Sequence, residues 1–196
     1  NYRFSVSWSR IMPNGKGEIN PEGVAFYSNL ADELLKAGIT PWVTIFHWDL
    51  PRALFEEGGF LNDKISDYFA DYAKTVVEIF GDRVKNYFIF NEPQVFVEDG
   101  HFTGAHAPFL RLSRSDVFKV AHNVLLSIGK AEKVMRKTAK IELDIGCSPC
   151  FTPMIPKRKE DAELALKYNF TPNGEFYDGC FFTDALIKGE FTEEYK

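Results

Sequence analysis

The chain has 196 residues, of which 45% are hydrophobic and 26% charged, a composition typical of a globular domain. Its formal net charge of -5 comes from acidic and basic residues interleaved along the chain, so there is no basic stripe and nucleic acid is not an expected partner. The longest apolar runs fall well short of the ~20 residues that cross a bilayer, so no membrane association is expected.

Three cysteines, an odd number in a chain too large to be a disulfide scaffold, favour a reducing compartment. No signal peptide is visible, and we therefore expect a cytoplasmic protein. The chain begins at Asn1, without Met, and enters an apolar run almost at once, which is typical of a piece of a longer protein.

Four apolar runs rich in β-formers predict strands near residues 2, 41, 86 and 140, and a helical pattern follows each of them. The first helix is expected between Asn20, as its N-cap, and Gly38, as its stop. The second is expected from a cap at Asn62 to Gly81, and the third from about Ser115. Two shorter helices are predicted over residues 160–170 and 176–188.

Strands that alternate with long helices predict an α/β fold with a parallel sheet. Both a doubly wound open sheet and an eight-stranded (β/α)8 TIM barrel satisfy this pattern. No strand is followed by the glycine fingerprint of nucleotide-binding sheets, and the loops after the strands are long and polar, as at the catalytic mouth of a barrel. The chain has room for only four βα units, so half of such a barrel would be absent.

Polar side chains gather where the predicted strands end: Arg3, His47, Trp48, Asp49, Asn91 and Glu92. In a barrel these separate stretches converge, because the carboxyl ends of parallel strands face one mouth. A half-buried carboxylate there is suited to general acid catalysis, and an amide beside it can bind a sugar hydroxyl. Asp49, just before Pro51, is expected to fix a turn rather than to take part in chemistry.

Along nearly its whole length the sequence resembles glycoside hydrolase family 1, the β-glucosidase and 6-phospho-β-glycosidase family of clan A. The resemblance rests on "YRFSVSWSRIMP", on "NPEGVAFYSNLADELLKAGITPWVTIFHWDLP" and on "FGDRVKNYFIFNEP". It implies a (β/α)8 barrel of which residues 1–196 supply about the second to fifth βα units, as a partial catalytic domain without the first strand and the C-terminal half.

The same resemblance implies a retaining β-glycosidase that hydrolyses terminal β-linked glucosides or related β-glycosides by double displacement. By position, Glu92 is the catalytic acid/base and Asn91 binds the 2-hydroxyl of the sugar. His47 and Trp48 contact the glycone, and Arg3 lies beneath the site, close to the nucleophile. This chemistry needs no metal and no organic cofactor, and the expected partners are a small carbohydrate and either the rest of the barrel or further copies of the chain.

Two features depart from the family pattern. Tyr87 and Ile89 stand where members usually have Trp and Thr, and both are expected to affect packing. Residues 97–196 contain nothing like the Thr-Glu-Asn-Gly motif that holds the family's nucleophile, so that group must lie outside this chain. Two alternatives stay open: another clan A barrel glycosidase, since several of its families share "NEP", and a carbohydrate-binding barrel fragment without turnover.

Other potential ligands have weaker support. "CSPC", at Cys147 and Cys150, has a redox or zinc spacing but neither sequence context, so ordinary thiols are expected. His101, His106 and His122 lie outside the motifs above, and His122 is expected to be structural.

Overall fold

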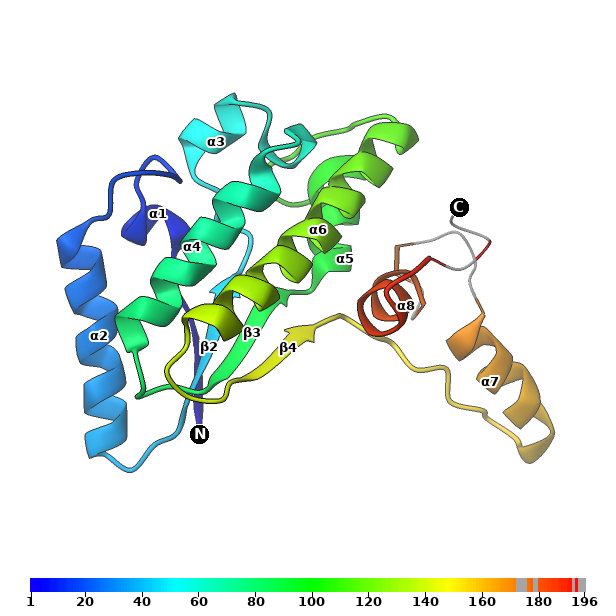
Figure 1. Cartoon of the computed structure of the whole chain (residues 1–196). Coiled ribbons are helices and arrows are strands. Elements are labelled where there is room, and N and C mark those ends of the chain that lie inside the picture. Colours follow the sequence, from blue (N-terminus) through cyan, green and yellow to red (C-terminus); the bar gives the residue numbers. More distant parts are fainter. Residues whose placement is uncertain (172–175, 178–179, 192, 194–196) are drawn as a thin grey trace. The chain divides into compact units, whose positions relative to one another are not determined.

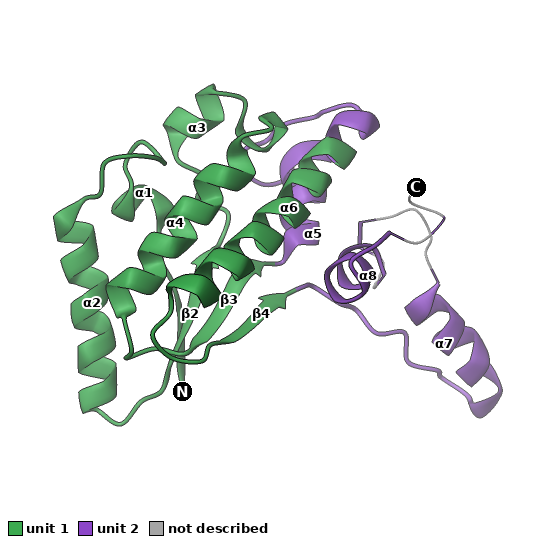
Figure 2. Ribbon diagram, viewed as in Figure 1, with its two compact units in different colours: residues 1–91, 118–148 green, residues 92–117, 149–196 purple. Residues whose placement is uncertain are grey.

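The structure is a computed structural model that describes residues 1–171, 176–177, 180–191 and 193. They divide into two compact units, shown in Figure 2. Unit 1 comprises residues 1–91 and 118–148, and unit 2 comprises residues 92–117 and 149–196. Each unit is described by itself.

Unit 1 is built on a parallel sheet whose strands lie in the order β1-β2-β3-β4. The strands are β1 (Tyr2–Ser5), β2 (Pro41–Phe46), β3 (Asn86–Asn91) and β4 (Asp144–Ser148). The long helices between them are α2 (Pro21–Lys36), α4 (Ile65–Phe80) and α6 (Arg114–Thr138), with α1 (Trp8–Ile11), α3 (Arg52–Glu56) and the 3-10 turn η1 (Gly59–Leu61) in the loops. The predicted alternation of strands and helices is confirmed.

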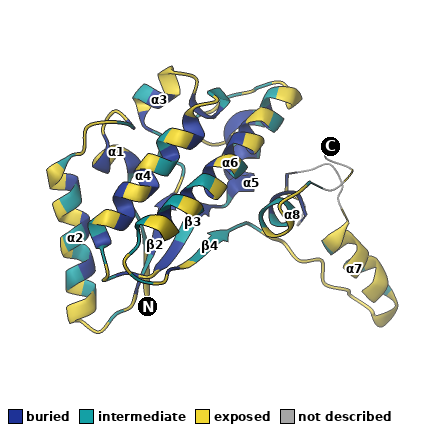
Figure 3. Ribbon diagram, in the orientation of Figure 1, coloured by how far each residue is buried: buried dark blue, intermediate teal, exposed yellow. Residues whose placement is uncertain are grey.

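The helices α2, α4 and α6 cover one face of the sheet (Figure 1). Phe4 of β1 shows this directly, because its ring stacks on Tyr27 of α2 and meets Phe80 of α4 edge-on. Lys130 of α6 donates a hydrogen bond to Ser66 of α4, which holds the neighbouring helices together. Figure 3 places the buried residues of unit 1 in the strands and on the helix surfaces that meet them.

Aromatic rings fill the layer between sheet and helices. Phe46 of β2 lies 4.7 Å from Phe90 of β3 and 5.9 Å from Phe69 of α4, measured between ring centroids. Tyr72 is fully buried, and its hydroxyl donates to the carbonyls of Val6 and Ile45, so it fastens α4 to the ends of β1 and β2. The high phenylalanine content of the chain therefore reflects a packed core in this unit.

The ends of the helices test the expected caps. Asn20 caps α2 by accepting from the N–H of Glu22, and Gly38 follows that helix with φ 70°. Gly81 ends α4 with φ 62°. The expected cap at Asn62 is wrong: α4 begins at Ile65 with Lys64 as its N-cap. Asn62 instead ends η1, and its side chain accepts from the N–H of Lys64 and donates to the carbonyl of Glu57.

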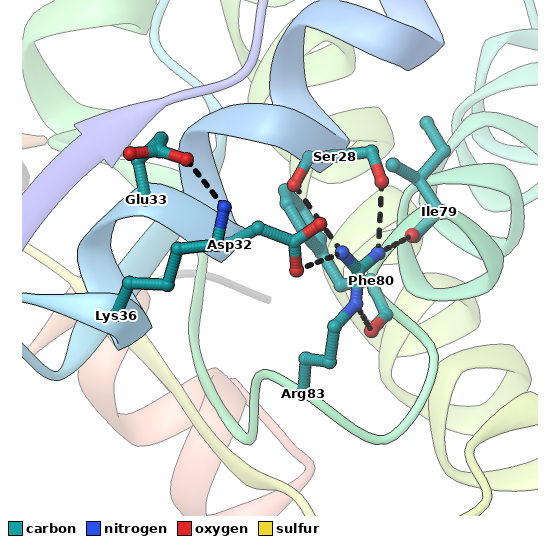
Figure 4. Close-up of polar contacts among 7 residues, drawn as sticks. All are labelled: Ser28, Asp32, Glu33, Lys36, Ile79, Phe80 and Arg83. Carbon is teal, nitrogen blue, oxygen red and sulfur yellow. Dashed lines mark hydrogen bonds and ion pairs between the residues drawn. The ribbon is translucent and has the colours of Figure 1, made fainter.

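Arg83 ties α2 to the C-terminal end of α4 (Figure 4). Its guanidinium pairs with Asp32 at 2.6 Å and also donates to both the carbonyl and the hydroxyl of Ser28. The same group donates to the carbonyls of Ile79 and Phe80, two of the acceptors that a helix leaves unpaired at its end. One half-buried side chain thus satisfies five acceptors on two helices.

Arg83→Ala is expected to lower the free energy of unfolding by about 1–3 kcal/mol, because charge-assisted hydrogen bonds are lost and helix-end carbonyls become unpaired. Urea denaturation of the complete protein that contains this chain measures the change. Arg52→Ala is the matched control, since Arg52 is exposed and pairs with Glu56 one turn away on the same helix. Equal stability of the two variants would contradict this role for Arg83.

Unit 2 contains α5 (Pro93–Val97), the π-helical turn η2 (Glu98–Phe102), the 3-10 turn η3 (Lys159–Asp161), α7 (Ala162–Phe170) and α8 (Phe181–Lys188). The helix expected over residues 160–170 is therefore confirmed, and that over 176–188 is confirmed from Phe181, with residues 178–179 outside the described part.

His101 of unit 2 is buried and packs against the ring of Phe96. Its Nδ1 donates a hydrogen bond to the carbonyl of Phe96, and burial lowers the pKa of the imidazole. Among the described residues, no helix is long and apolar enough to cross a membrane.

Candidate active site

Site residues of unit 1 lie at the carboxyl ends of the first three strands, except Arg3, which is the second residue of β1 and not at its end as expected. Ser5 ends β1, His47 and Trp48 directly follow β2, and Asn91 ends β3. Because the strands are parallel and adjacent, these ends share one edge of the sheet. That edge is where ligands bind in parallel α/β folds.

Arg3 is held in place by three contacts. Its Nε donates to Thr44 Oγ1 at 2.8 Å, and its terminal nitrogen donates to Asn91 Oδ1 at 2.6 Å. The guanidinium also lies 4.5 Å from the ring centroid of Phe88, a distance at which the cation is attracted to the ring face. The register places Thr44 beside Phe88 on the neighbouring strand, so β2 and β3 together fix the position of the cation.

His47 and Trp48 both meet Asn91. The Nε2 of His47 lies 3.0 Å from Asn91 Nδ2, and its Nδ1 lies 2.9 Å from Ser5 Oγ. Trp48 Nε1 donates to the backbone carbonyl of Asn91 at 2.8 Å. Asn91 is 5% exposed, so the residue is almost wholly buried. The structure therefore brings Arg3, His47, Trp48 and Asn91 together, although Arg3 and Asn91 are 88 positions apart.

Two residues at the strand ends adopt backbone conformations that residues with side chains rarely take. Trp48 has φ 75°, and Glu92 has φ 42° and ψ 65°. Such left-handed geometry costs of order 1–3 kcal/mol and persists where the surroundings enforce it, often at functional sites. Glu92 is half-buried, follows Asn91 directly, and is the first residue of unit 2; Pro93 then begins α5.

Asp49 has a structural role near the site. Its carboxylate accepts from the backbone N–H of Trp8 at 2.9 Å and so joins the loop after β2 to the start of α1. Burial raises the pKa of Asp49, and hydrogen bonds from Ser7 and from backbone groups, including that of Asp49 itself, partly offset the rise. The carboxylate connects two loops 41 positions apart, which is a longer-range contact than the local turn expected from the sequence.

No metal centre is found in the described part of the chain, and the Cys147 thiol is held in its protonated form by burial. No group of three or more His, Cys, Asp or Glu side chains there could hold a metal ion. Burial raises the pKa of the Cys147 thiol to about 12, and the thiol donates to the carbonyl of Phe90. Cys147 and Cys150 are free cysteines.

Ser5 and Thr44 were not among the residues singled out from the sequence, yet each contacts a site residue directly. A hydroxyl within an otherwise apolar strand was the available signal, in "YRFSVSW" and in "WVTIF". Tyr87 and Ile89, the departures from the family pattern, are each 1% exposed, in line with a packing role. Among the described residues the buried Tyr87 hydroxyl has no hydrogen-bond partner.

Comparison with known proteins agrees with this edge-of-sheet site. The sequence profile of glycosyl hydrolase family 1 matches residues 1–196. Beta-glucosidase A of Acetivibrio thermocellus is 40% identical over 195 residues, and a 6-phospho-beta-glucosidase of Bacillus subtilis is 38% identical over 197 residues. The solved beta-glucosidase from Thermotoga maritima in complex with noeuromycin superposes with a TM-score of 0.85 at 40% identity.

Fold and sequence together define part of a (β/α)8-barrel glycoside hydrolase. The chain belongs to glycosyl hydrolase family 1. It spans less than half of the relatives it matches: 98% of this chain corresponds to 42% of the Acetivibrio enzyme and to 42% of the Thermotoga structure, and 99% corresponds to 40% of the Bacillus enzyme. Family membership sets aside the other clan A families as an alternative.

Proposed function

We propose that residues 1–196 are the part of a retaining β-glycosidase that carries the catalytic acid/base and much of the glycone site. The observation that carries the proposal is that Arg3 and His47 both hydrogen-bond the side chain of Asn91, and Asn91 directly precedes Glu92 in the sequence. An amide and an imidazole can bind sugar hydroxyls, and a half-buried carboxyl next in the chain can transfer a proton. The named relatives, which include beta-glucosidases and a 6-phospho-beta-glucosidase, support a β-glycoside as substrate.

Glu92 is assigned two successive tasks. It first donates a proton to the leaving oxygen, and it then takes a proton from the water that hydrolyses the glycosyl-enzyme. The covalent bond to the sugar is made by a second carboxylate, which retaining enzymes keep ~5–5.5 Å from the first. That nucleophile is contributed by sequence outside residues 1–196, where Arg3 would lie close to it.

Asn91, His47 and Trp48 are assigned to the glycone. Asn91 is placed to bind the 2-hydroxyl, the position whose hydrogen bonds strengthen most in the transition state of such enzymes. The His47 ring, whose two nitrogens contact Asn91 and Ser5, is assigned to a neighbouring hydroxyl, and the Trp48 ring, T-shaped to His47 at 5.3 Å, offers an apolar surface. Each role requires a side chain held rigidly, as the contacts of Asn91 provide.

Unit 2 exposes apolar side chains, as expected if residues 1–196 are part of a larger domain. Four large apolar side chains of α7 are more than half exposed: Leu164, Leu166, Tyr168 and Phe170. Apolar exposure on this scale is typical of a surface that other protein covers. We assign residues 1–196 to about the second to fifth βα units, with the rest of the barrel as the covering partner and the reducing cytoplasm as its compartment.

The direct test is a panel of nitrophenyl glycosides assayed with the complete protein that contains this chain. The proposal predicts nitrophenol release from β-glucoside or a related β-glycoside and none from the α-anomers. A sugar-binding barrel without turnover predicts no release from any member of the panel, while calorimetry still detects sugar binding. That second result would overturn the assignment of an enzyme.

A further inference from the structure

The hydrogen bonds around Asn91 have only one consistent direction. A guanidinium carries N–H donors and no acceptor, so the atom of Asn91 that faces Arg3 at 2.6 Å must be the carbonyl oxygen Oδ1. Arg3 cannot turn away easily, because Thr44 accepts from its Nε and Phe88 lies against its plane. The orientation of the Asn91 amide is therefore set by a permanent cation.

That orientation decides the state of the His47 ring. With Oδ1 facing Arg3, the amide nitrogen Nδ2 faces His47 Nε2 at 3.0 Å. An amide nitrogen only donates, so Nε2 must accept and carries no proton. The single proton of the neutral imidazole is then on Nδ1, where Ser5 Oγ lies at 2.9 Å and accepts it.

We propose that Ser5 is a positioning residue which, together with Arg3 acting through Asn91, holds His47 as the neutral tautomer protonated on Nδ1. The series runs Thr44, Arg3, Asn91, His47, Ser5, with each donor facing an acceptor. A proton on Nε2 would point at the Asn91 amino group and break the series.

The tautomer has a consequence for substrate choice, which rests on the proposed function. Nε2 has a single lone pair, which accepts from Asn91 Nδ2, so a glycone hydroxyl can bond Nε2 only by taking the place of that amide N–H and acting as the donor. A hydroxyl satisfies this requirement, whereas fluorine or a methoxy oxygen at the same position can only accept. The site would therefore select a hydrogen-bond donor at the carbon that faces His47.

The test reads the tautomer directly, by long-range ¹H–¹⁵N NMR of the histidine rings in the complete, ligand-free protein. His47→Asn identifies the signal by its disappearance. We expect a protonated Nδ1 and an unprotonated Nε2 in the wild type. A ring protonated on Nε2, or on both nitrogens, at neutral pH would overturn the proposal.

Ser5→Ala removes the acceptor of the Nδ1 proton, so the His47 signal is expected to change towards a mixture of tautomers. Catalytic efficiency, kcat/KM, should fall about 3–10-fold, the equivalent of one neutral hydrogen bond. Ser5→Thr keeps a hydroxyl and should restore both readouts, and Ser9→Ala, an exposed serine of α1, should change neither. An unchanged ring signal in Ser5→Ala would refute the role of Ser5.

Arg3→Met provides an independent arm, because it frees the Asn91 amide to turn. In this variant the His47 ring signal should show a mixture of the two tautomers even though Ser5 is intact. An unchanged ring signal would refute the proposed role of Arg3 in fixing the tautomer. The NMR readout needs no turnover. A protein with the expected tautomer but no β-glycosidase activity would refute the proposed function and leave the tautomer assignment standing.

Discussion

If the proposed function is correct, Glu92→Ala in the complete protein that contains this chain is expected to slow hydrolysis of alkyl β-glucosides by several orders of magnitude. A general acid is typically worth ~10²–10⁴ in rate, and an alkoxide leaving group needs that proton fully. A dinitrophenolate departs with little help, so the first step on dinitrophenyl β-glucoside should be affected far less. The contrast between the two aglycones, measured as kcat/KM, identifies Glu92 as the acid.

The same variant should also be defective in the second step, because water has lost its base. Dinitrophenyl β-glucoside is expected to give a burst of dinitrophenolate, followed by accumulation of the glycosyl-enzyme. Azide needs no deprotonation, so added azide should restore turnover and yield the β-glucosyl azide, the product of two inversions. Glu142→Ala, a change at an exposed glutamate before β4, is the matched control and should behave as the wild type.

Equal losses for both aglycones without azide rescue would place Glu92 outside the acid/base role. An α-glucosyl azide would instead move it to the role of nucleophile. Circular dichroism of the variant separates either result from misfolding. Glu92 has a left-handed backbone, so Ala at this position retains the strain of the wild type and does not add to it.

Asn91→Ala is expected to lower kcat/KM on β-glucosides by about 10²–10³-fold, since hydrogen bonds to the 2-hydroxyl contribute several kcal/mol in the transition state. The amide also links Arg3 to His47, so its loss loosens both side chains. Trp48 donates to the backbone carbonyl of residue 91, and that contact survives the change. Asn29→Ala, on the exposed surface of α2, is the control.

A substrate without the 2-hydroxyl makes this test specific. The wild type should hydrolyse the 2-deoxy glucoside far more slowly than the glucoside. Asn91→Ala, which is already slow on the glucoside, should hydrolyse the two substrates at similar rates. Such strong non-additivity is what a direct contact produces. Additive losses from the two changes would show that Asn91 acts elsewhere than at the 2-hydroxyl.

The sequence predicts the alternation of strands and helices well, because periodicity and glycine stops are local signals. At α2 both local signals are correct, because Asn20 caps the helix and Gly38 follows its end with a positive φ. Asn62 shows where they fail. Asn62 ends a 3-10 turn and its side chain bonds Glu57 and Lys64, an arrangement that no local pattern distinguishes from a helix cap.

The network around Asn91 could not be predicted, because it depends on which residues of neighbouring strands lie side by side. Thr44 meets Arg3 only because the register sets Ser5 beside Thr44 and Thr44 beside Phe88. A shift of one residue would turn each of these side chains to the opposite face. The left-handed backbone of Trp48 and Glu92 is likewise a product of tertiary structure, since neither residue type favours it.

The measurement that tests the central claim most directly is the configuration of the first sugar released. Proton NMR of the complete enzyme acting on an aryl β-glucoside distinguishes β-glucose from α-glucose before the two interconvert. A double displacement with Glu92 as acid/base predicts β-glucose first, with the α-anomer appearing only as the solution equilibrates. Release of α-glucose first would show a single inversion and contradict the assignment of a retaining glycosidase.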